Sequence, residues 1–331
     1  RWVAGSLSNR WLWIFRVMGP RMTMRPLSFR LVCLASVFGL GSARCGGEGS
    51  SPVGPSPGPS PSQLAASVPW ARVAGRIAYA RFDTPTQMST LAIIDGTTRS
   101  VVDIRTERSN EFIELAFRPT GDAVAYTSLS SGRALRLIRL DGSPSQPLFP
   151  TEEITGFPAY APDGRLAYYY NGAPFGRSIF VDGVPFLTDA PHESTRVAWS
   201  PDGREMVVSR LSGPARLERV DVATRERTSV YVADGRWILG NPVFSPDGAL
   251  LAFERTEGGP SEIWICNRDG SDARRLTAGF GDASPAFSPD GKEVVFARYA
   301  GISAALRIIK TDGSQEAPLI DSFGYYPSWI R

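Results

Sequence analysis

The stretch from Asn241 to Gly291, NPVFSPDGALLAFERTEGGPSEIWICNRDGSDARRLTAGFGDASPAFSPDG, contains one full copy of a repeated unit and the start of the next. The tetrapeptide Ser245-Pro-Asp-Gly248 returns as Ser288-Pro-Asp-Gly291 at the end of the stretch. Short apolar runs such as Ile263-Trp-Ile lie between the two copies. Pro-Asp-Gly suits a type I turn, because Pro fixes φ, Asp tolerates the third position and Gly accepts a positive φ. The stretch therefore predicts short β-strands joined by tight turns.

The same turn recurs along the chain at a regular interval. Ala161-Pro-Asp-Gly164 and Ser200-Pro-Asp-Gly203 repeat it, and Arg118-Pro-Thr-Gly121 is a degenerate copy. The glycines at 121, 164, 203, 248 and 291 are 43, 39, 45 and 43 residues apart, and Gly75 lies 46 residues before Gly121. Asp-Gly, a strong hairpin signal, keeps the same phase at 95–96, 141–142, 182–183, 269–270 and 312–313. Two turn signals with one period predict six units.

The last complete unit shows four strands, which we predict at Ser284–Phe287, Glu293–Ala297, Ala305–Ile309 and Glu316–Ile320. Four strands in about 43 residues match the blade of a β-propeller. We therefore predict an all-β fold, a six-bladed propeller of four-stranded antiparallel blades over residues 75–331. The aromatic residue that ends the first strand of each unit is expected to pack between blades; these residues are Phe117, Tyr160, Trp199, Phe244 and Phe287.

The phase of the repeat also predicts how the ring closes. The chain enters at the second strand of the first blade, at about Arg76–Ala80, and ends on Tyr326-Pro-Ser-Trp-Ile330, which matches a first strand. We expect this C-terminal strand to complete the first blade, so that no bare strand edge is left at the seam.

Composition limits the chemistry that the chain can perform. The formal charge of +3 is scattered along 331 residues, so the sequence carries no nucleic-acid footprint. One His and three Cys are too few for an ordinary zinc site, and we expect no metal and no cofactor. Cys266 lies in a predicted strand, where we interpret it as a small core residue.

The N-terminal region is typical of an exported protein. We interpret residues 1–23 as a segment upstream of the true start and residues 24–44 as a signal peptide. Arg25 and Arg30 supply the positive region, Leu31–Leu40 the apolar stretch, and Gly41-Ser-Ala43 the small residues before cleavage. Residues 45–74, rich in Gly, Ser and Pro, are expected to form a disordered tether ahead of the propeller.

Cys45, followed by Gly46-Gly47, resembles the lipidated cysteine of bacterial lipoproteins. That resemblance implies a lipid anchor on Cys45 and a periplasmic or outer-membrane protein. Ser42 and Arg44 depart from the motif, which expects an aliphatic residue and a small one at these two places. The alternative is ordinary cleavage after Ala43, which would release an exported protein without the anchor.

The combination of Pro-x-aromatic-Ser-Pro-Asp-Gly, Ile-Trp-Ile, Asp-Gly-Ser and Arg275-Leu-Thr277 resembles the TolB-like β-propeller repeats of bacterial exported proteins. The resemblance covers residues 75–331 and implies a WD-like repeat fold without fixing the function. TolB itself is a periplasmic partner of the lipoprotein Pal and carries an N-terminal α/β domain, whose place is taken here by the short tether. Prolyl oligopeptidase-type enzymes carry related propellers, but this chain has no Gly-x-Ser-x-Gly nucleophile motif.

Several polar residues invite a catalytic interpretation. The aspartates of the Pro-Asp-Gly turns could suggest a ring of acids, and Asn267–Asp272 faintly resembles a calcium loop, but turn chemistry accounts for both. His192 has Glu193 and Ser194 beside it in sequence. Neighbours in sequence rarely form a triad, so we interpret His192 as a solvated loop residue rather than a catalytic base.

A more plausible functional surface is collective. In a propeller, the loops between the fourth strand of one blade and the first strand of the next gather on one face around the channel. Aromatic residues and Arg are the usual anchors of binding sites, although Trp237 and Phe280 could instead cap the seams between blades. The candidate binding residues on this face are His192, Arg236, Trp237, Phe280, Asp282, Phe323 and Tyr325.

We therefore expect an exported, membrane-tethered, monomeric scaffold that binds a protein or an envelope polymer without catalysis. The alternative is a hydrolase or lyase that acts on peptides or glycans at the channel mouth. An enzyme should show titratable groups with displaced pKa values on this face, and a binder should show an aromatic or apolar patch. A Tol–Pal role is a third hypothesis, which requires that the protein bind Pal.

Overall fold

The computed structural model describes residues 58–83, 86–108, 111–129, 133–149, 155–188, 196–210, 214–235, 237–279, 281–301, 303–321 and 324–331. The predicted upstream segment, signal peptide and lipidation site, and the first part of the tether, lie outside these residues. Among the described residues, no helix is long and apolar enough to cross a membrane.

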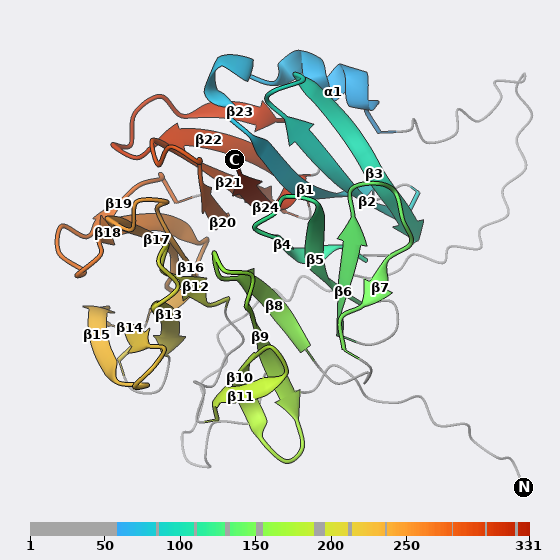
Figure 1. Cartoon of the computed structure of the whole chain (residues 1–331). Helices are drawn as coiled ribbons and strands as arrows, with labels where there is room; N and C mark the ends of the chain where they lie inside the picture. The colour runs from blue at the N-terminus through green and yellow to red at the C-terminus, as the bar shows by residue number, and fades with distance from the viewer. Residues whose placement is uncertain are drawn as a thin grey trace, which may run out of the picture. The chain divides into compact units, whose positions relative to one another are not determined.

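The described strands form six four-stranded antiparallel sheets arranged in a ring, whose centre we call the channel (Figure 1). The first strand of each sheet contacts the first strand of a neighbouring sheet, as β24 contacts β4 and β16 contacts β20, so these strands surround the channel. The prediction of a six-bladed propeller is confirmed.

The six blades are built in the following order, from the channel outward. Blade 1 contains β24 (Gly324–Ile330), β1 (Arg76–Asp83), β2 (Met88–Asp95) and β3 (Ser100–Arg108). Blade 2 contains β4 (Ile113–Phe117), β5 (Ala123–Ser128), β6 (Ala134–Arg139) and β7 (Gln146–Pro147). Blade 3 contains β8 (Thr155–Tyr160), β9 (Leu166–Gly172), β10 (Gly176–Val181) and β11 (Val184–Leu187). Blade 4 contains β12 (Ala198–Trp199), β13 (Glu205–Arg210), β14 (Arg216–Asp221) and β15 (Arg227–Val232). Blade 5 contains β16 (Ile238–Phe244), β17 (Leu250–Thr256), β18 (Glu262–Asn267) and β19 (Arg274–Arg275). Blade 6 contains β20 (Asp282–Phe287), β21 (Glu293–Ala300), β22 (Ser303–Lys310) and β23 (Ala317–Ile320).

The ring closes as the phase of the repeat predicts. The C-terminal strand β24 pairs antiparallel with β1, with Trp329 opposite Ile77 and Ile330 opposite Arg76. The indole of Trp329 also donates a hydrogen bond of 2.6 Å to the carbonyl of Ala74. The last strand of the chain therefore supplies the innermost strand of the blade that the first strand begins.

The Pro-Asp-Gly turns have the predicted geometry. Gly248 adopts a φ of +73°, and its N–H donates to the Ser245 carbonyl at 2.8 Å. Asp247 accepts hydrogen bonds from the Ser245 hydroxyl at 2.6 Å and from the Ala249 N–H at 3.0 Å. The Ser245 hydroxyl is the main reason why the pKa of Asp247 lies below its usual value. The turn aspartate is thus occupied by its own loop, which confirms the structural interpretation.

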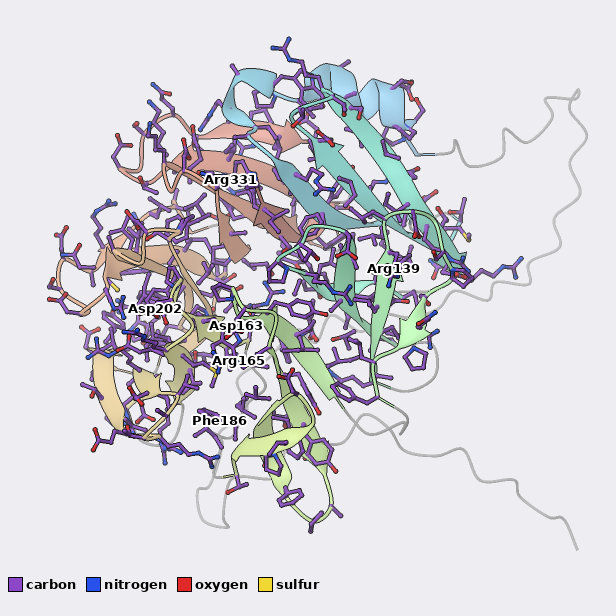
Figure 2. All side chains as sticks on the ribbon, viewed as in Figure 1. Arg139, Asp163, Arg165, Phe186, Asp202 and Arg331 are labelled. Carbon is purple, nitrogen blue, oxygen red and sulfur yellow. The ribbon has the colours of Figure 1, made fainter. Side chains whose placement is uncertain are left out.

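The turns also join neighbouring blades. Figure 2 shows Asp163 and Arg165 of blade 3 close to Asp202 of blade 4. Arg165 donates to Asp163 at 2.8 Å and to the Gly203 carbonyl at 2.8 Å, and its guanidinium lies 4.8 Å from the ring centre of Trp199. Trp199 is buried and donates its indole N–H to the Ala159 carbonyl of blade 3. The aromatic residue that ends this first strand therefore packs between blades, as predicted.

Residues 58–74 differ from the expected tether. Helix α1 (Pro61–Ser67) begins with a capping box between Ser60 and Gln63 and contacts both β3 of blade 1 and β23 of blade 6 (Figure 1). Leu64 is buried in the core between these two blades. Composition predicted disorder because the segment has few apolar residues. Those few residues nevertheless pack at the interface between blades 1 and 6.

A basic side chain fastens the same segment to blade 6. Arg72 is the last residue of a short 3₁₀ turn (Trp70–Arg72) and donates to both carboxylate oxygens of Glu293, at 3.0 and 2.6 Å. It also donates to the Gln315 carbonyl at 2.7 Å. Residues 58–74 therefore form a strap, which crosses the seam where β24 closes the ring.

Candidate functional site

Each blade contributes one residue to the channel. This residue lies three positions before the aromatic residue that ends the first strand of the blade. At four of these positions the next residue is proline, which lacks an N–H and interrupts the ladder. Glu114, Phe157, Asn241, Ser284 and Tyr326 all take a positive φ there, between 44° and 56°. The result is a β-bulge, which interrupts the regular backbone pairing and changes the direction of the side chain at this position. The six residues at this position are Glu114, Phe157, Arg196, Asn241, Ser284 and Tyr326.

Two carboxylates accept hydrogen bonds from backbone N–H groups that the bulges leave without a partner strand. Glu114 accepts a hydrogen bond of 2.9 Å from the N–H of Phe157 in the next blade, and it pairs with Arg133. Glu254 of β17 likewise accepts from the N–H of Ser284 in the next blade. An amide left unpaired in such a buried place would be costly, so each carboxylate stabilises the join between two blades.

Arg196 connects two blades that are not neighbours. Its Nη2 donates a hydrogen bond of 2.9 Å to the Leu115 carbonyl, so a side chain of blade 4 reaches the innermost strand of blade 2. Its Nε is buried and has no hydrogen-bond partner within the part of the chain that the structure describes. Burial lowers the pKa of Arg196, which Glu114 and Glu254 partly counteract by their charge.

Other groups in the channel are also displaced from their ordinary pKa values. Burial raises the pKa of Glu254, and it raises the pKa of Tyr326 to about 12. Burial raises the pKa of Tyr299 as well. These groups satisfy the titration criterion for an enzyme, but both carboxylates are already engaged by backbone N–H groups. Among the described residues, no group of three or more His, Cys, Asp or Glu is arranged to hold a metal ion.

Tyr325, one of the predicted binding residues, lies in an aromatic pocket beside the channel. Its ring centre is 5.7 Å from that of Tyr299 and 6.4 Å from that of Tyr326. The three tyrosines share a cavity of about 340 Å³ with Phe82 and Phe112. Arg81 and Ser89 supply polar groups at its wall. We call this cavity the tyrosine pocket; it lies between blades 1 and 6.

Trp237 and Asp282 are placed elsewhere. The guanidinium of Arg255 lies 3.7 Å from the ring centre of Trp237 and 4.2 Å from that of Trp264, so Trp237 packs in a stack within blade 5. Asp282 is fully buried and accepts two hydrogen bonds from Arg298, at 2.6 and 2.9 Å. Neither side chain joins Tyr325 in the tyrosine pocket. His192, Arg236, Phe280 and Phe323 lie outside the described residues.

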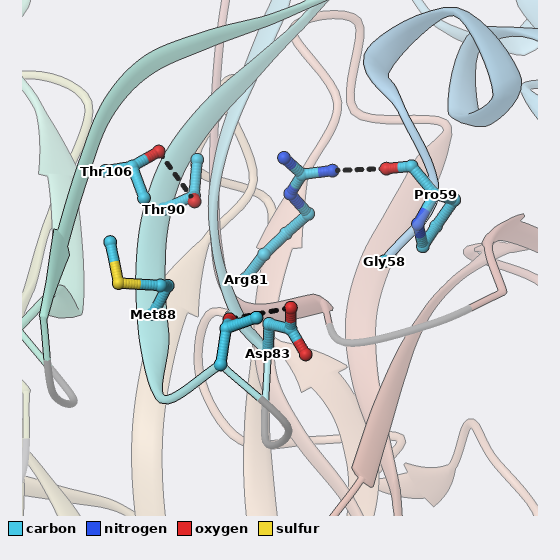
Figure 3. A pocket seen from close by; sticks show the side chains of 8 residues that line it. Gly58, Pro59, Arg81, Asp83, Met88, Thr90 and Thr106 are labelled. Atoms are coloured by element: carbon cyan, nitrogen blue, oxygen red, sulfur yellow. Dashed lines mark hydrogen bonds between the residues drawn. The ribbon is translucent and has the colours of Figure 1, made fainter. Parts of the chain in front are cut away.

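A second, more polar cavity borders the tyrosine pocket. It measures about 230 Å³ and lies between Gly58–Pro59 of the strap and the strands of blade 1 (Figure 3). Arg81 lines both cavities; it donates to the Pro59 carbonyl at 3.2 Å and to Asp103 at 2.6 Å. The hydroxyls of Thr90 and Thr106 bond each other at 3.0 Å on the same wall. The strap therefore ends beside the pocket that contains Tyr325.

Sequence reasoning missed most of the channel residues because it looked at loops. Tyr299 lies on β21, and Glu114 and Tyr326 lie on inner strands. A usable signal was present: when the repeats are aligned on their terminal aromatic residue, the position three residues earlier carries a charged residue or a tyrosine in three of the six blades, at Glu114, Arg196 and Tyr326. Cys266 is buried, and burial raises its pKa to about 12, in line with the predicted core role.

Comparison with known proteins identifies the fold family. The family profile described as the TolB beta propeller domain matches residues 74–330.

The chain belongs to the TolB β-propeller family.

Individual members of the family resemble the chain over part of their length. An uncharacterized protein of Agrobacterium fabrum, Atu1656, is 28% identical over 171 residues, which is 47% of this chain and 56% of that protein. The Tol-Pal system protein TolB of Anaeromyxobacter dehalogenans is 37% identical over 81 residues, which is 24% of this chain and 18% of that protein. The chain thus spans little more than half of the first relative and a small part of the second.

Solved structures of this family share the fold. TolB from Acinetobacter baumannii has a TM-score of 0.66 at 24% identity, and the match covers 77% of this chain and 66% of that one. A TolB-type protein of Agrobacterium tumefaciens has a TM-score of 0.61 at 22% identity, with 78% and 95% covered. At this level of identity the likeness supports the TolB-type propeller architecture and no particular ligand.

The raised pKa of Glu254 predicts a pH-dependent contribution to the stability of this TolB-type propeller. Folded Glu254 keeps its proton above the ordinary value of 4.5, whereas the unfolded chain releases it there. The folded state then binds more protons, so this group makes the unfolding free energy fall as pH rises above 4.5. Glu254→Gln keeps the oxygen that accepts the Ser284 N–H and cannot titrate. Urea unfolding should show the Gln variant gaining stability relative to the parent as pH increases.

Glu254→Ala is the matched control, because it removes the acceptor as well as the charge. It should lose about 1–3 kcal/mol at every pH, since the Ser284 amide is left unpaired. If the Gln variant and the parent have parallel pH profiles, the assignment of a raised pKa to Glu254 is wrong.

Proposed function

We propose that this protein is an exported binding scaffold, tethered to a bacterial membrane through Cys45, whose propeller holds a protein or an envelope polymer without catalysis. The observation that carries the proposal is the tyrosine pocket. Aromatic rings offer large, rigid contact surfaces, and tyrosine is enriched at the energetic centres of interfaces. Membership of the TolB β-propeller family, whose named members include Tol-Pal system proteins, supports the same class of function.

The chemistry of the channel favours binding over hydrolysis. A general base must reach a substrate proton, yet Glu114 and Glu254 each accept hydrogen bonds from the bulged backbone of the next blade. Tyr326, with its pKa raised to about 12, stays protonated at neutral pH. The tyrosine pocket, lined by Tyr299, Tyr325 and Tyr326, offers aromatic rings against which a ligand can pack.

The binding proposal predicts a dependence on Tyr325. The full chain should recover a discrete partner from an envelope extract of its own bacterium, and Tyr325→Ala should lower that recovery at least tenfold, because a buried aromatic anchor contributes 1–3 kcal/mol or more. Phe175→Ala is the matched control, since Phe175 is an aromatic residue, 43% exposed, on blade 3. Recovered proteins are identified by mass spectrometry, and purified peptidoglycan is tested in parallel by co-sedimentation.

Equal recovery by the Tyr325→Ala variant and the parent would contradict the assignment of the pocket. Recovery of Pal would extend the proposal to a Tol–Pal role, and its absence would count against that role alone.

The tether proposal predicts the cellular fraction. Lipidated Cys45 would hold the protein in the membrane fraction, and Cys45→Ser should move it to the soluble envelope fraction, because the thiol that carries the lipid is gone. Immunoblots of separated fractions measure this, with Cys266→Ser as the control substitution. A parent protein found in the soluble fraction would exclude the anchor and favour cleavage after Ala43.

A further inference from the structure

The half of the channel nearest the Pro-Asp-Gly turns is a separate cavity of about 280 Å³. It opens beside Pro119 and Pro162, which belong to the turns, so it faces away from the tyrosine pocket. Its walls are largely apolar and come from the inner strands of blades 1 to 5. The aromatic residues among them are Phe117, Tyr160, Trp199, Phe244 and Trp329. We call this cavity the turn-face funnel.

Arg196 is the single charged residue among the described residues that line the funnel. Glu114 and Glu254 do not belong to the lining set. Nη2 of Arg196 is engaged by the Leu115 carbonyl, but its Nε donor is buried and has no partner among the described residues. A buried donor on a charged group that lacks an acceptor is uncommon in proteins, because its desolvation is not offset.

A hydroxyl-bearing residue contacts the same inner strand of blade 2, whose Leu115 carbonyl accepts a hydrogen bond from Arg196. The Ser328 hydroxyl oxygen accepts a hydrogen bond of 3.1 Å from the N–H of Phe117, and Ser328 also lines the funnel. A hydroxyl that accepts through oxygen retains its own proton for donation. The funnel thus presents one cation and one hydroxyl donor among aromatic and proline walls.

We propose that the turn-face funnel binds the carboxylate of a ligand with a narrow apolar body. The carboxylate accepts hydrogen bonds from Arg196 and Ser328, and the apolar body packs against the rings of the wall. Charge-assisted hydrogen bonds are stronger than those between neutral groups, so the guanidinium of Arg196 favours a carboxylate over an uncharged group. The volume of about 280 Å³ lies at the small end of ligand cavities, so the group that enters is a chain end or a small organic acid.

This site is independent of the proposed binding at Tyr325. Among the described residues, none that lines the tyrosine pocket also lines the funnel. The failure of one proposal therefore leaves the other standing, and variants in one cavity serve as controls for the other.

The test compares an acid with its uncharged twin on the full chain. 4-Phenylbutyrate and 4-phenylbutyramide have the same shape, and Trp199 and Trp329 in the funnel wall report binding by fluorescence, with calorimetry as the second measurement. We expect the acid to bind at least tenfold more tightly than the amide, because only the acid forms the charge-assisted bonds. Equal affinity for the two compounds, or no binding of the acid at millimolar concentration, overturns the proposal.

Variants assign the preference to particular residues. Arg196→Gln should remove the preference for the acid and leave the affinity for the amide unchanged, whereas Arg196→Lys should keep part of the preference. Tyr325→Ala should change neither affinity. A preference that survives in a folded Arg196→Gln protein overturns the proposal. If that variant fails to fold, Ser328→Ala takes its place; it should weaken the acid about two- to tenfold and spare the amide, and an unchanged acid affinity overturns the proposal.

Two further probes distinguish the sources of the carboxylate. N-acetyl-Ala-Phe with a free C-terminus represents a peptide chain end, and its C-terminal amide is the control. Tighter binding of the free peptide than of phenylbutyrate assigns the funnel to the end of a partner chain, and the reverse order assigns it to a small acid. Both results uphold the carboxylate site.

Discussion

The pairing of β24 with β1 is the contact on which the rest of this molecule depends. A four-stranded blade cannot bury both of its faces alone, so each blade relies on two neighbours, and the ring is complete only when its two ends share a sheet. Trp329 opposite Ile77 provides that sheet. The strap adds a second crossing of the same seam through Leu64 and through the ion pair of Arg72 with Glu293. Both chain-terminal parts of the fold thus converge on one junction.

The channel follows from the same constraint. Six inner strands that face one axis leave little room for regular pairing, and the proline-linked bulges turn one side chain per strand out of its ladder. The bulges leave backbone N–H groups without a partner strand. Glu114 and Glu254 accept hydrogen bonds from two of these groups. The two carboxylates of the channel therefore join neighbouring blades. The two cavities proposed to bind ligands lie on either side of them. One side offers the tyrosine pocket beside the strap, and the other offers an apolar funnel with a single arginine.

Much of the fold could be predicted from the sequence because its turns carry their own chemistry. Pro, Asp and Gly at fixed offsets specify a turn without help from distant residues, so the number of blades and their phase followed, and so did the closing strand. The strap could not be predicted from composition, because Leu64 and Arg72 gain their partners only when blades 1 and 6 come together. The candidate site was likewise predicted only in part. Tyr325 was proposed as a loop residue, although it lies on strand β24, whereas Tyr299, Tyr326 and Arg196 come together only through the geometry of the ring.

Amide hydrogen exchange at the seam tests the account most directly. The closing contact should open only when the whole ring unfolds, so the amides of Ile77 and Trp329 should exchange as slowly as those of Val294 and Val295 in the centre of blade 6. Exchange at Ile77 and Trp329 that is about a hundredfold faster than at Val294, while blade 6 remains protected, would show that the seam opens on its own. The ring would then not depend on the pairing of its two ends.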